Sequence, residues 1–191
     1  MAKHVRILNE EILSNNWYTL KKFTFDYLKK DGSRQTQTRE AYDRGNGAVI
    51  LLFNKNDKTV ILTRQFRLPT FINGNADGML IEACAGLLDK DQPEVAIKRE
   101  TEEETGYQVK EVRKIFEAYM SPGSVTEILY FFVAEYSSNE KINEGGGVEG
   151  EDIDVLELPF EKALAMIDTG EIKDGKTIML LYYAHVNQVF H

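Results

Sequence analysis

Residues Ala85 to Tyr107 read A-G-L-L-D-K-D-Q-P-E-V-A-I-K-R-E-T-E-E-E-T-G-Y, and this stretch guides the interpretation of the whole chain. We expect a loop that leads into a helix. Pro93 suits the first helical position, and Asp91 or Gln92 can cap the helix. Gly106 stands where a left-handed residue commonly ends a helix. The stretch therefore predicts a glycine-containing loop followed by a helix with a defined start and end.

The predicted helix concentrates negative charge on one face. Glu100, Glu103 and Glu104 are three or four positions apart, so their carboxylates share that face. Like charges at this spacing repel each other, and acidic residues near a helix C-terminus interact unfavourably with the helix dipole. Each effect destabilises the helix by roughly a few tenths of a kcal/mol. The cluster indicates a compensating cation, and oxygen ligands favour Mg²⁺ or Mn²⁺ over zinc. The alternative is a solvated acidic face that Lys98 and Arg99 partly screen.

The same run resembles the Nudix box, a loop-helix-loop motif in which a glycine, an R-E pair and further glutamates stand at fixed offsets. Arg99-Glu100, Glu103-Glu104 and Gly106-Tyr107 match the motif in register. Gly86 lies one residue closer to Arg99 than is usual in the family, and Gln92 or Asp91 holds the position of the upstream glutamate of the motif. The resemblance implies an α/β fold, the Nudix α/β/α sandwich with a mixed sheet.

The composition is that of a globular protein and not of a disordered one. The chain has 191 residues, 42% of them hydrophobic, enough for one domain with a small appendage. Its net charge of −8 argues against broad nucleic-acid binding, which needs a basic surface. The longest apolar runs are strand-length and the first residues form no apolar leader, so we expect a soluble, cytoplasmic protein without a membrane partner. The lone Cys84 is expected to be a buried packing residue rather than a catalytic thiol.

Residues 1–43 read as a separate small antiparallel β unit. Aromatic residues alternate with other residues from Phe23 to Tyr27, and Asp31-Gly32 marks a hairpin. So small a sheet is not expected to be stable alone. It must pack on the following domain, residues 44–191, or on another subunit, which is one reason to expect a homodimer.

The remaining domain alternates strand and helix signals. Strands are predicted at residues 49–53, 59–66, 79–85, 109–119, 127–136 and 152–158. Amphipathic helices are predicted at residues 159–169 and 176–189. Strands that flank the acidic helix imply a mixed sheet with helical cover. The polar run 137–151 contains Gly145-Gly146-Gly147 and is expected to be a functional loop.

The Nudix resemblance implies a metal site and a general base. Its implied metal ligands are the Ala85 carbonyl, Glu100, Glu104 and Glu151. The E-G-E-D-I run places Glu149 two residues before Glu151, and a similar pair in the nucleoside-diphosphate-sugar branch supplies one base and one metal ligand. We therefore expect Glu149 to be the base, with Glu103 as the rival and Glu151 as the third catalytic residue. The alternative is a solvated, acid-rich loop.

The implied reaction is attack of water on the phosphorus of a diphosphate, with a carboxylate accepting the proton. A carboxylate held among other carboxylates has a raised pKa, which suits a base. Arg67 and Arg39 are candidates for bidentate phosphate contacts, or they are surface ion-pair residues. Trp17-Tyr18 can stack on a nucleobase, or these rings can serve packing alone.

Four further runs, I-E-A-C-A-G-L-L-D, S-P-G-S-V-T-E, E-G-E-D-I and D-G-K-T, resemble the nucleoside-diphosphate-sugar branch over residues 40 to 180. This implies Mg²⁺-dependent (or Mn²⁺-dependent) cleavage of GDP-mannose to GMP and mannose 1-phosphate by a homodimer with swapped N-terminal strands. ADP-ribose cleavage to AMP and ribose 5-phosphate is the alternative. The implied substrate-binding residues are Trp17, Thr38, Arg39, Glu40, Arg67, Ala85, Gly86, Leu87, Glu104, Glu127, Gly150, Glu151 and Lys176.

Two other classes of function remain open at this point. A Nudix-like binding protein would sense a nucleotide sugar without cleaving it, although the intact carboxylates of the box argue against this. A structural cation-binding module would gain thermal stability from Mg²⁺ but bind no phosphate ligand.

Overall fold

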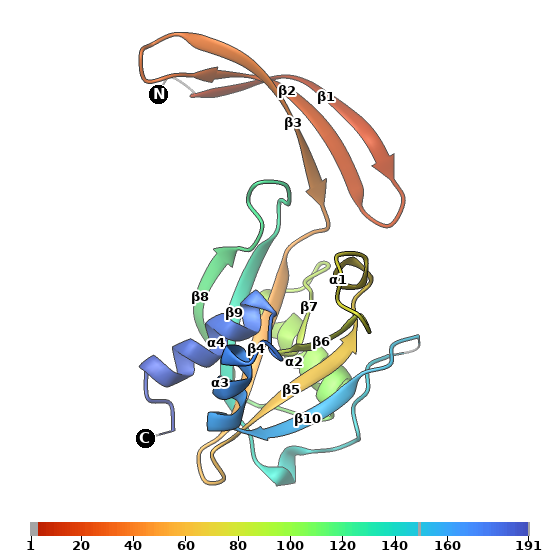
Figure 1. Ribbon diagram of the computed structural model, residues 1–191, viewed down its shortest axis with the longest axis vertical. Helices are drawn as coiled ribbons and strands as arrows, with labels where there is room; N and C mark the ends of the chain where they lie inside the picture. The colour runs from red at the N-terminus through yellow and green to blue at the C-terminus, as the bar shows by residue number, and fades with distance from the viewer. Residues whose placement is uncertain (1–3, 149, 191) are drawn as a thin grey trace. The chain divides into compact units, whose positions relative to one another are not determined.

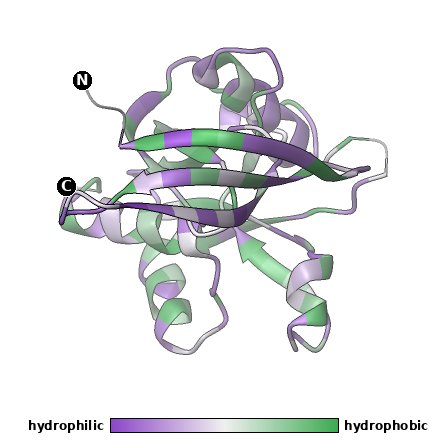
Figure 2. Cartoon of the chain, turned by 90° about the horizontal axis from the view of Figure 1, so that it is seen from above, coloured by the Kyte–Doolittle hydropathy of each residue, from purple (hydrophilic) through white to green (hydrophobic). Residues whose placement is uncertain are grey.

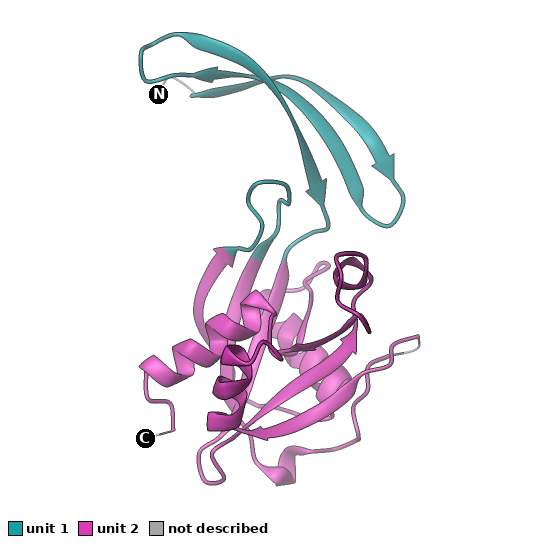
Figure 3. Ribbon diagram, viewed as in Figure 1, with its two compact units in different colours: residues 1–46, 119–128 teal, residues 47–118, 129–191 magenta. Residues whose placement is uncertain are grey.

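The computed structural model describes residues 4–148 and 150–190 (Figure 1). Two compact units divide the chain (Figure 3). Unit 1 contains the residues up to 46 together with residues 119–128, and unit 2 contains residues 47–118 and those from 129 onwards. The connection between two strands of unit 2 therefore belongs to unit 1, a division that the sequence did not predict.

Unit 1 is built on a three-stranded antiparallel sheet in the order β1-β2-β3. Its strands are β1 (Val5–Asn15), β2 (Thr19–Leu28) and β3 (Arg34–Asp43). The hairpin predicted at Asp31-Gly32 is present: Ser33 donates from its N–H and its hydroxyl to Asp31 Oδ1, at 2.9 and 2.6 Å. Gly32 has a φ of 81°, which favours glycine.

This sheet exposes many large hydrophobic side chains. Hydrophobic and hydrophilic stretches alternate along its strands in Figure 2. The exposed members are Val5, Ile7, Leu8, Ile12, Leu13, Trp17 and Tyr27. Scattered exposed hydrophobic residues are common, but so many on one small sheet are typical of a surface that contacts another protein.

Unit 2 contains a seven-stranded mixed sheet, as the sequence predicts. Its main path is β10-β5-β4-β9-β8, with β6 paired to β5 and β7 paired to β4. The strands are β4 (Gly47–Asn54), β5 (Thr59–Phe66), β6 (Met79–Glu82), β7 (Ala85–Leu87), β8 (Arg113–Tyr119), β9 (Ile128–Glu135) and β10 (Asp154–Pro159). The β4–β9 pair is parallel and the β4–β5 pair is antiparallel, which makes the sheet mixed.

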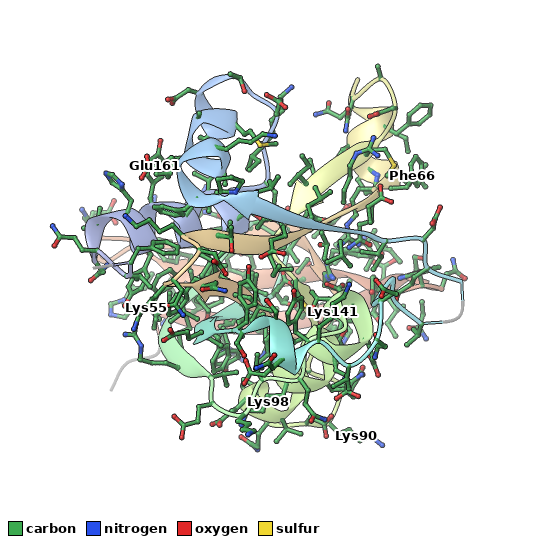
Figure 4. The ribbon with its side chains drawn as sticks, turned by 90° about the horizontal axis from the view of Figure 1, so that it is seen from below. Lys55, Phe66, Lys90, Lys98, Lys141 and Glu161 are labelled. Carbon is green, nitrogen blue, oxygen red and sulfur yellow. The ribbon has the colours of Figure 1, made fainter. Side chains whose placement is uncertain are left out.

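Helices cover both faces of this sheet. They are α1 (Leu68–Ile72), α2 (Pro93–Thr105), α3 (Phe160–Asp168) and α4 (Gly175–Val186), with a 3₁₀ turn at Ser138–Glu140. Figure 4 shows α2, which carries Lys98, on the opposite side from α3, which carries Glu161. This is the α/β/α sandwich that the sequence predicts. None of the described helices has both the length and the hydrophobicity needed to cross a lipid bilayer.

Strand β4 is the centre of the core. All eight of its residues are buried, because both faces of the strand are covered. Ile50 packs in one cluster with Ile97 of α2 and with Cys84, which is buried as predicted. Leu51 points to the other face, since successive strand residues alternate. Each such side chain contributes roughly 1.5–3 kcal/mol when it is fully buried.

The structure corrects two predictions about local elements and adds one helix. The single strand predicted at residues 79–85 is two strands, because the chain changes partner from β5 to β4 at Ala83-Cys84. The strand predicted at residues 109–119 begins only at Arg113. The short helix α1, which starts with Leu68-Pro69, was not predicted.

Candidate active site

Helix α2 is the element that positions the acidic residues, and its bounds match the prediction. Pro93 is its first residue, and Gly106 ends it with a φ of 77° while donating its N–H to the Glu102 carbonyl at 3.0 Å. Gln92 occupies the N-cap position, but neither its side chain nor that of Asp91 caps the helix. The prediction of a side-chain cap was therefore wrong.

The three glutamates of the acidic face lie close together, and Arg99 compensates part of their charge. Its guanidinium forms ion pairs with Glu100 at 3.1 Å and with Glu103 at 3.4 Å. It also lies within 4 Å of Asp89 and Asp91, at 3.9 and 3.8 Å. One guanidinium thus faces four carboxylates, so the local charge remains negative.

Glu104 is the most deeply buried of these acids, with 5% of its surface exposed. It accepts a hydrogen bond from the Ala85 N–H at 3.3 Å. Burial raises the pKa of Glu104 to about 7; a hydrogen bond with Cys84 acts against this rise, and the charge of Glu100 adds to it. The positive charge of Arg67 also lowers that pKa, which places Arg67 within electrostatic reach of the acidic face.

Glu100 is perturbed in the same direction. Burial raises its pKa, Arg99 opposes the rise, and the charges of Glu103 and Glu151 add to it. A nearby cation strongly stabilises the ionised form of a carboxylate that is both desolvated and surrounded by like charges. Glu100 and Glu151 come from distant parts of the sequence, and the fold brings them into electrostatic contact.

The strand β7 faces this carboxylate group through Gly86. A Cβ atom at Gly86 would overlap the side-chain carboxyl group of Glu100, so a larger residue at this position would displace that carboxylate. Its neighbours Ala85 and Leu87 are half-buried in the same strand. The unusual spacing between Gly86 and Arg99 therefore does not prevent the glycine from meeting the acidic face.

The side chains around the acidic face determine which metal ion fits there. Among the residues that the structure describes, no three Asp, Glu, His or Cys side chains converge tightly enough to enclose a metal. The available donors are nevertheless all oxygens, and burial raises the pKa of both Glu100 and Glu104. A hard divalent cation relieves both desolvation and mutual repulsion in such a set. The chemistry of the donors therefore fits Mg²⁺ or Mn²⁺.

The glycine run of residues 145–147 is packed against the C-terminal end of α2. The Gly146 and Gly147 N–H groups donate to the carbonyls of Glu104 and Glu103, at 2.9 and 3.0 Å. These bonds satisfy carbonyls that have no partner within the helix. A Cβ at Gly145, whose φ is 69°, would overlap the Glu104 backbone. The three glycines thus allow the close approach that carries the following residues to the acidic face.

Residues after this run include three of the predicted site residues. Glu151 accepts a hydrogen bond from the Val148 N–H at 2.9 Å, which holds its carboxylate over the loop. Gly150 has a φ of 92° and is exposed. Glu149, the preferred general base, lies outside the described residues.

Two of the predicted substrate-binding residues are cations that share one buried acid, Glu82. Arg67 follows β5 and donates its Nε–H to Glu82 Oε2 at 2.7 Å. Lys176, in the first turn of α4, donates from Nζ to Glu82 Oε1 at 2.5 Å and pairs with Asp174 at 3.0 Å. Sequence reasoning missed Glu82. The available signal was an acid between Ile81 and Ala83 in an otherwise apolar strand.

Five of the predicted ligands lie in unit 1. They are Trp17, Thr38, Arg39, Glu40 and Glu127. Trp17 is 84% exposed in the turn between β1 and β2. Thr38, Arg39 and Glu40 are consecutive on β3, and the Arg39 guanidinium donates to the Thr38 carbonyl at 2.7 Å. Glu127 lies 3.6 Å from the Arg44 guanidinium.

Comparison with known proteins adds independent information. The family model of the NUDIX domain matches residues 43–181, and the model described as the GDP-mannose pyrophosphatase NudK N-terminal domain matches residues 4–42. Proteins named GDP-mannose pyrophosphatase from Escherichia coli K12 and from Shigella dysenteriae serotype 1 are each 58% identical over 189 residues, covering 99% of both chains.

A solved structure described as an ADP compounds hydrolase superposes with a TM-score of 0.74 at 18% identity, covering 99% of this chain and 98% of that one. This likeness supports the fold alone. The NUDIX match spans most of the sequence, and the relatives are similar over their full length. The chain therefore belongs to the Nudix family of pyrophosphohydrolases.

Proposed function

We propose that the chain hydrolyses the diphosphate bond of GDP-mannose with Mg²⁺ as cofactor, giving GMP and mannose 1-phosphate. The observation that carries this proposal is the acidic face of α2, which lies within electrostatic reach of Arg67 and Glu151. The GDP-mannose pyrophosphatases that are 58% identical support the choice of substrate.

Each residue of the site has a proposed task. A divalent ion held by Glu100, Glu104, Glu151 and the Ala85 carbonyl would neutralise phosphate charge and lower the pKa of the attacking water. Glu103 or Glu149 accepts the proton from that water. Glu103 is partly exposed beside Arg99, which leaves it accessible to solvent. Arg67 and Lys176 bind phosphate oxygens, and Gly86 keeps space for the Glu100 carboxylate.

The remaining predicted ligands are proposed to recognise the nucleoside and the sugar. Trp17 is an exposed indole that can stack on a guanine ring. Arg39 and Glu40 on β3 and Glu127 supply donors and acceptors for polar groups. The division into residues 1–43 and 44–191, the homodimer and the cytoplasmic location stay predictions.

The test is a substrate panel measured with Mg²⁺. Products of GDP-mannose cleavage are separated by anion-exchange chromatography, and kcat/KM is compared between GDP-mannose and ADP-ribose. GMP and mannose 1-phosphate in equal amounts support the proposal. A higher kcat/KM for ADP-ribose would replace the substrate assignment by the alternative.

The base is identified by comparing Glu103→Gln with Glu149→Gln. Loss of the base removes the acidic limb from the pH profile of kcat, whereas loss of a residue that only binds substrate leaves the limb in place. Tight binding of GDP-mannose without turnover, unchanged by Glu103→Gln, would indicate a binding protein instead.

A further inference from the structure

Glu82 stands out because it is an almost fully buried carboxylate to which none of the proposed tasks is assigned. Its side chain is 4% exposed at the end of β6. Burying a carboxylate is unfavourable unless it is paired and hydrogen-bonded. The fold supplies two cations from elements far apart in the sequence, Arg67 after β5 and Lys176 on α4. Each carboxylate oxygen receives one of them.

The contact between Arg67 and Glu82 uses only the Nε atom of Arg67 and leaves its two Nη groups available for a ligand. Glu82 accepts from Nε, and within the described ranges neither Nη nitrogen has a hydrogen-bond or ion-pair partner. The side chain is 39% exposed. The guanidinium is planar, so fixing Nε also fixes the direction of the two Nη groups that can bind an oxyanion in a bidentate manner.

Lys176 is held more tightly, with 14% of its side chain exposed. Besides Glu82, it contacts Asp174, the N-cap residue of α4. The other oxygen of Asp174 accepts from the Thr177 N–H and hydroxyl, at 3.0 and 2.6 Å. The Ala83 N–H donates to the same hydroxyl at 2.6 Å. The residue after Glu82 is thereby tied to the start of α4, so the carboxylate and the lysine belong to one rigid network.

We propose that Glu82 is a positioning residue that holds Arg67 and Lys176 at a fixed separation, so that both cations meet the diphosphate of the substrate together. This proposal rests on the proposed function of the site. Without the carboxylate, the two cations would repel each other. Their long side chains would also have to be ordered when the substrate binds, which would weaken binding. Glu82 compensates the repulsion and orders both side chains before the substrate binds.

The variant Glu82→Gln tests this role, because an amide keeps the shape but loses the charge and one acceptor. We expect the KM for GDP-mannose to rise about tenfold to a hundredfold, the effect of losing a charge-assisted hydrogen bond. The Mg²⁺ concentration for half-maximal rate should stay unchanged, because Glu82 is not among the proposed metal ligands. Glu157→Gln is the matched control. Glu157 lies on β10 and accepts hydrogen bonds from Tyr136 and from Thr59 of β5, and the KM of this variant should stay at the wild-type value.

A double-mutant cycle separates positioning from general stability. In an Arg67→Ala background, Glu82→Gln should raise KM by less than about threefold, because one of the two cations that it aligns is gone. Equal effects in both backgrounds, or an unchanged KM with only a lower Tm, would overturn the proposal. If Glu82→Gln does not fold, Glu82→Asp serves instead. Glu82→Asp keeps the charge on a shorter side chain. It should raise KM when it is the only substitution but not when it is combined with Arg67→Ala.

Calorimetric titration with inorganic pyrophosphate and Mg²⁺ keeps this inference distinct from the proposed function. A wild-type protein that cleaves neither GDP-mannose nor ADP-ribose refutes the proposed function. The positioning role is still decided by the Kd of pyrophosphate, which should be at least about tenfold weaker in Glu82→Gln than in wild type. An equal Kd in the two proteins would overturn the inference.

Discussion

Glu104→Gln is expected to make the metal-free protein more stable at alkaline pH while removing hydrolysis. Glu104 is buried, and burial raises its pKa to about 7 from an ordinary value of 4.5. A carboxylate of this kind opposes folding when it is ionised, since the unfolded chain ionises it more easily. Glutamine keeps the oxygen that accepts the Ala85 N–H but carries no charge.

The magnitude follows from the shift in pKa. Below pH 4.5 the carboxyl is protonated in both states, so the replacement has no electrostatic effect. As the pH rises from 4.5 through 7, the native state of the wild type progressively loses stability, up to about 3 kcal/mol. In a chain of 191 residues this corresponds to a Tm difference of roughly 6–12 °C above pH 8.

The assay is thermal unfolding in EDTA at pH 5 and pH 8, followed by circular dichroism. Glu94→Gln is the control, because Glu94 lies on the same helix, is exposed and pairs with Lys98 at 3.2 Å. The Tm of Glu104→Gln should exceed that of wild type at pH 8 and approach it at pH 5. A lower Tm at pH 8, or a difference that does not depend on pH, would refute the reasoning about the buried charge.

Three further predictions test other parts of the site. Gly86→Ala should lower kcat about 100-fold with little change in Tm, because the new Cβ displaces the Glu100 carboxylate by about 1 Å; an unchanged kcat would contradict the close approach. Gly145→Ala should lower the free energy of unfolding in urea by about 1–3 kcal/mol, because residue 145 has a φ of 69° and the new Cβ would overlap the α2 backbone. Gly123→Ala is the control and should be neutral, since its Cβ would meet no atom within 4 Å. Mg²⁺ at 100 times its Kd should stabilise the wild type by about 2.7 kcal/mol at pH 8, and Glu104→Gln by clearly less; equal stabilisation would exclude Glu104 as a ligand.

Local patterns made α2 and its surroundings predictable. The helix start at Pro93, its end at Gly106 and the spacing of its glutamates depend on neighbouring residues alone, so the sequence carries them directly. The side-chain cap was predicted wrongly, because Gln92 takes the N-cap position with extended backbone angles and no cap hydrogen bond. Pro93, preorganised for the first turn, provides a start signal without that bond.

Features that depend on long-range contacts could not be predicted in the same way. The two partners of Glu82 lie 15 and 94 residues away in the sequence, so no local pattern connects them. The break between β6 and β7 arises because Cys84 O accepts from Ile50 N at 2.9 Å, a contact with a different strand from the one that β6 pairs with. The packing of Gly146 on the Glu104 carbonyl likewise appears only in the folded chain.

We propose that the acidic face of α2 supports metal-dependent cleavage of a nucleotide-sugar diphosphate. The most direct test is ³¹P NMR of wild-type protein with GDP-mannose, first in EDTA and then after addition of excess Mg²⁺. We expect an unchanged diphosphate signal in EDTA, followed after addition of Mg²⁺ by the phosphomonoester signals of GMP and mannose 1-phosphate. Intact GDP-mannose after addition of Mg²⁺, with folded protein in the sample, would contradict metal-dependent cleavage at this site.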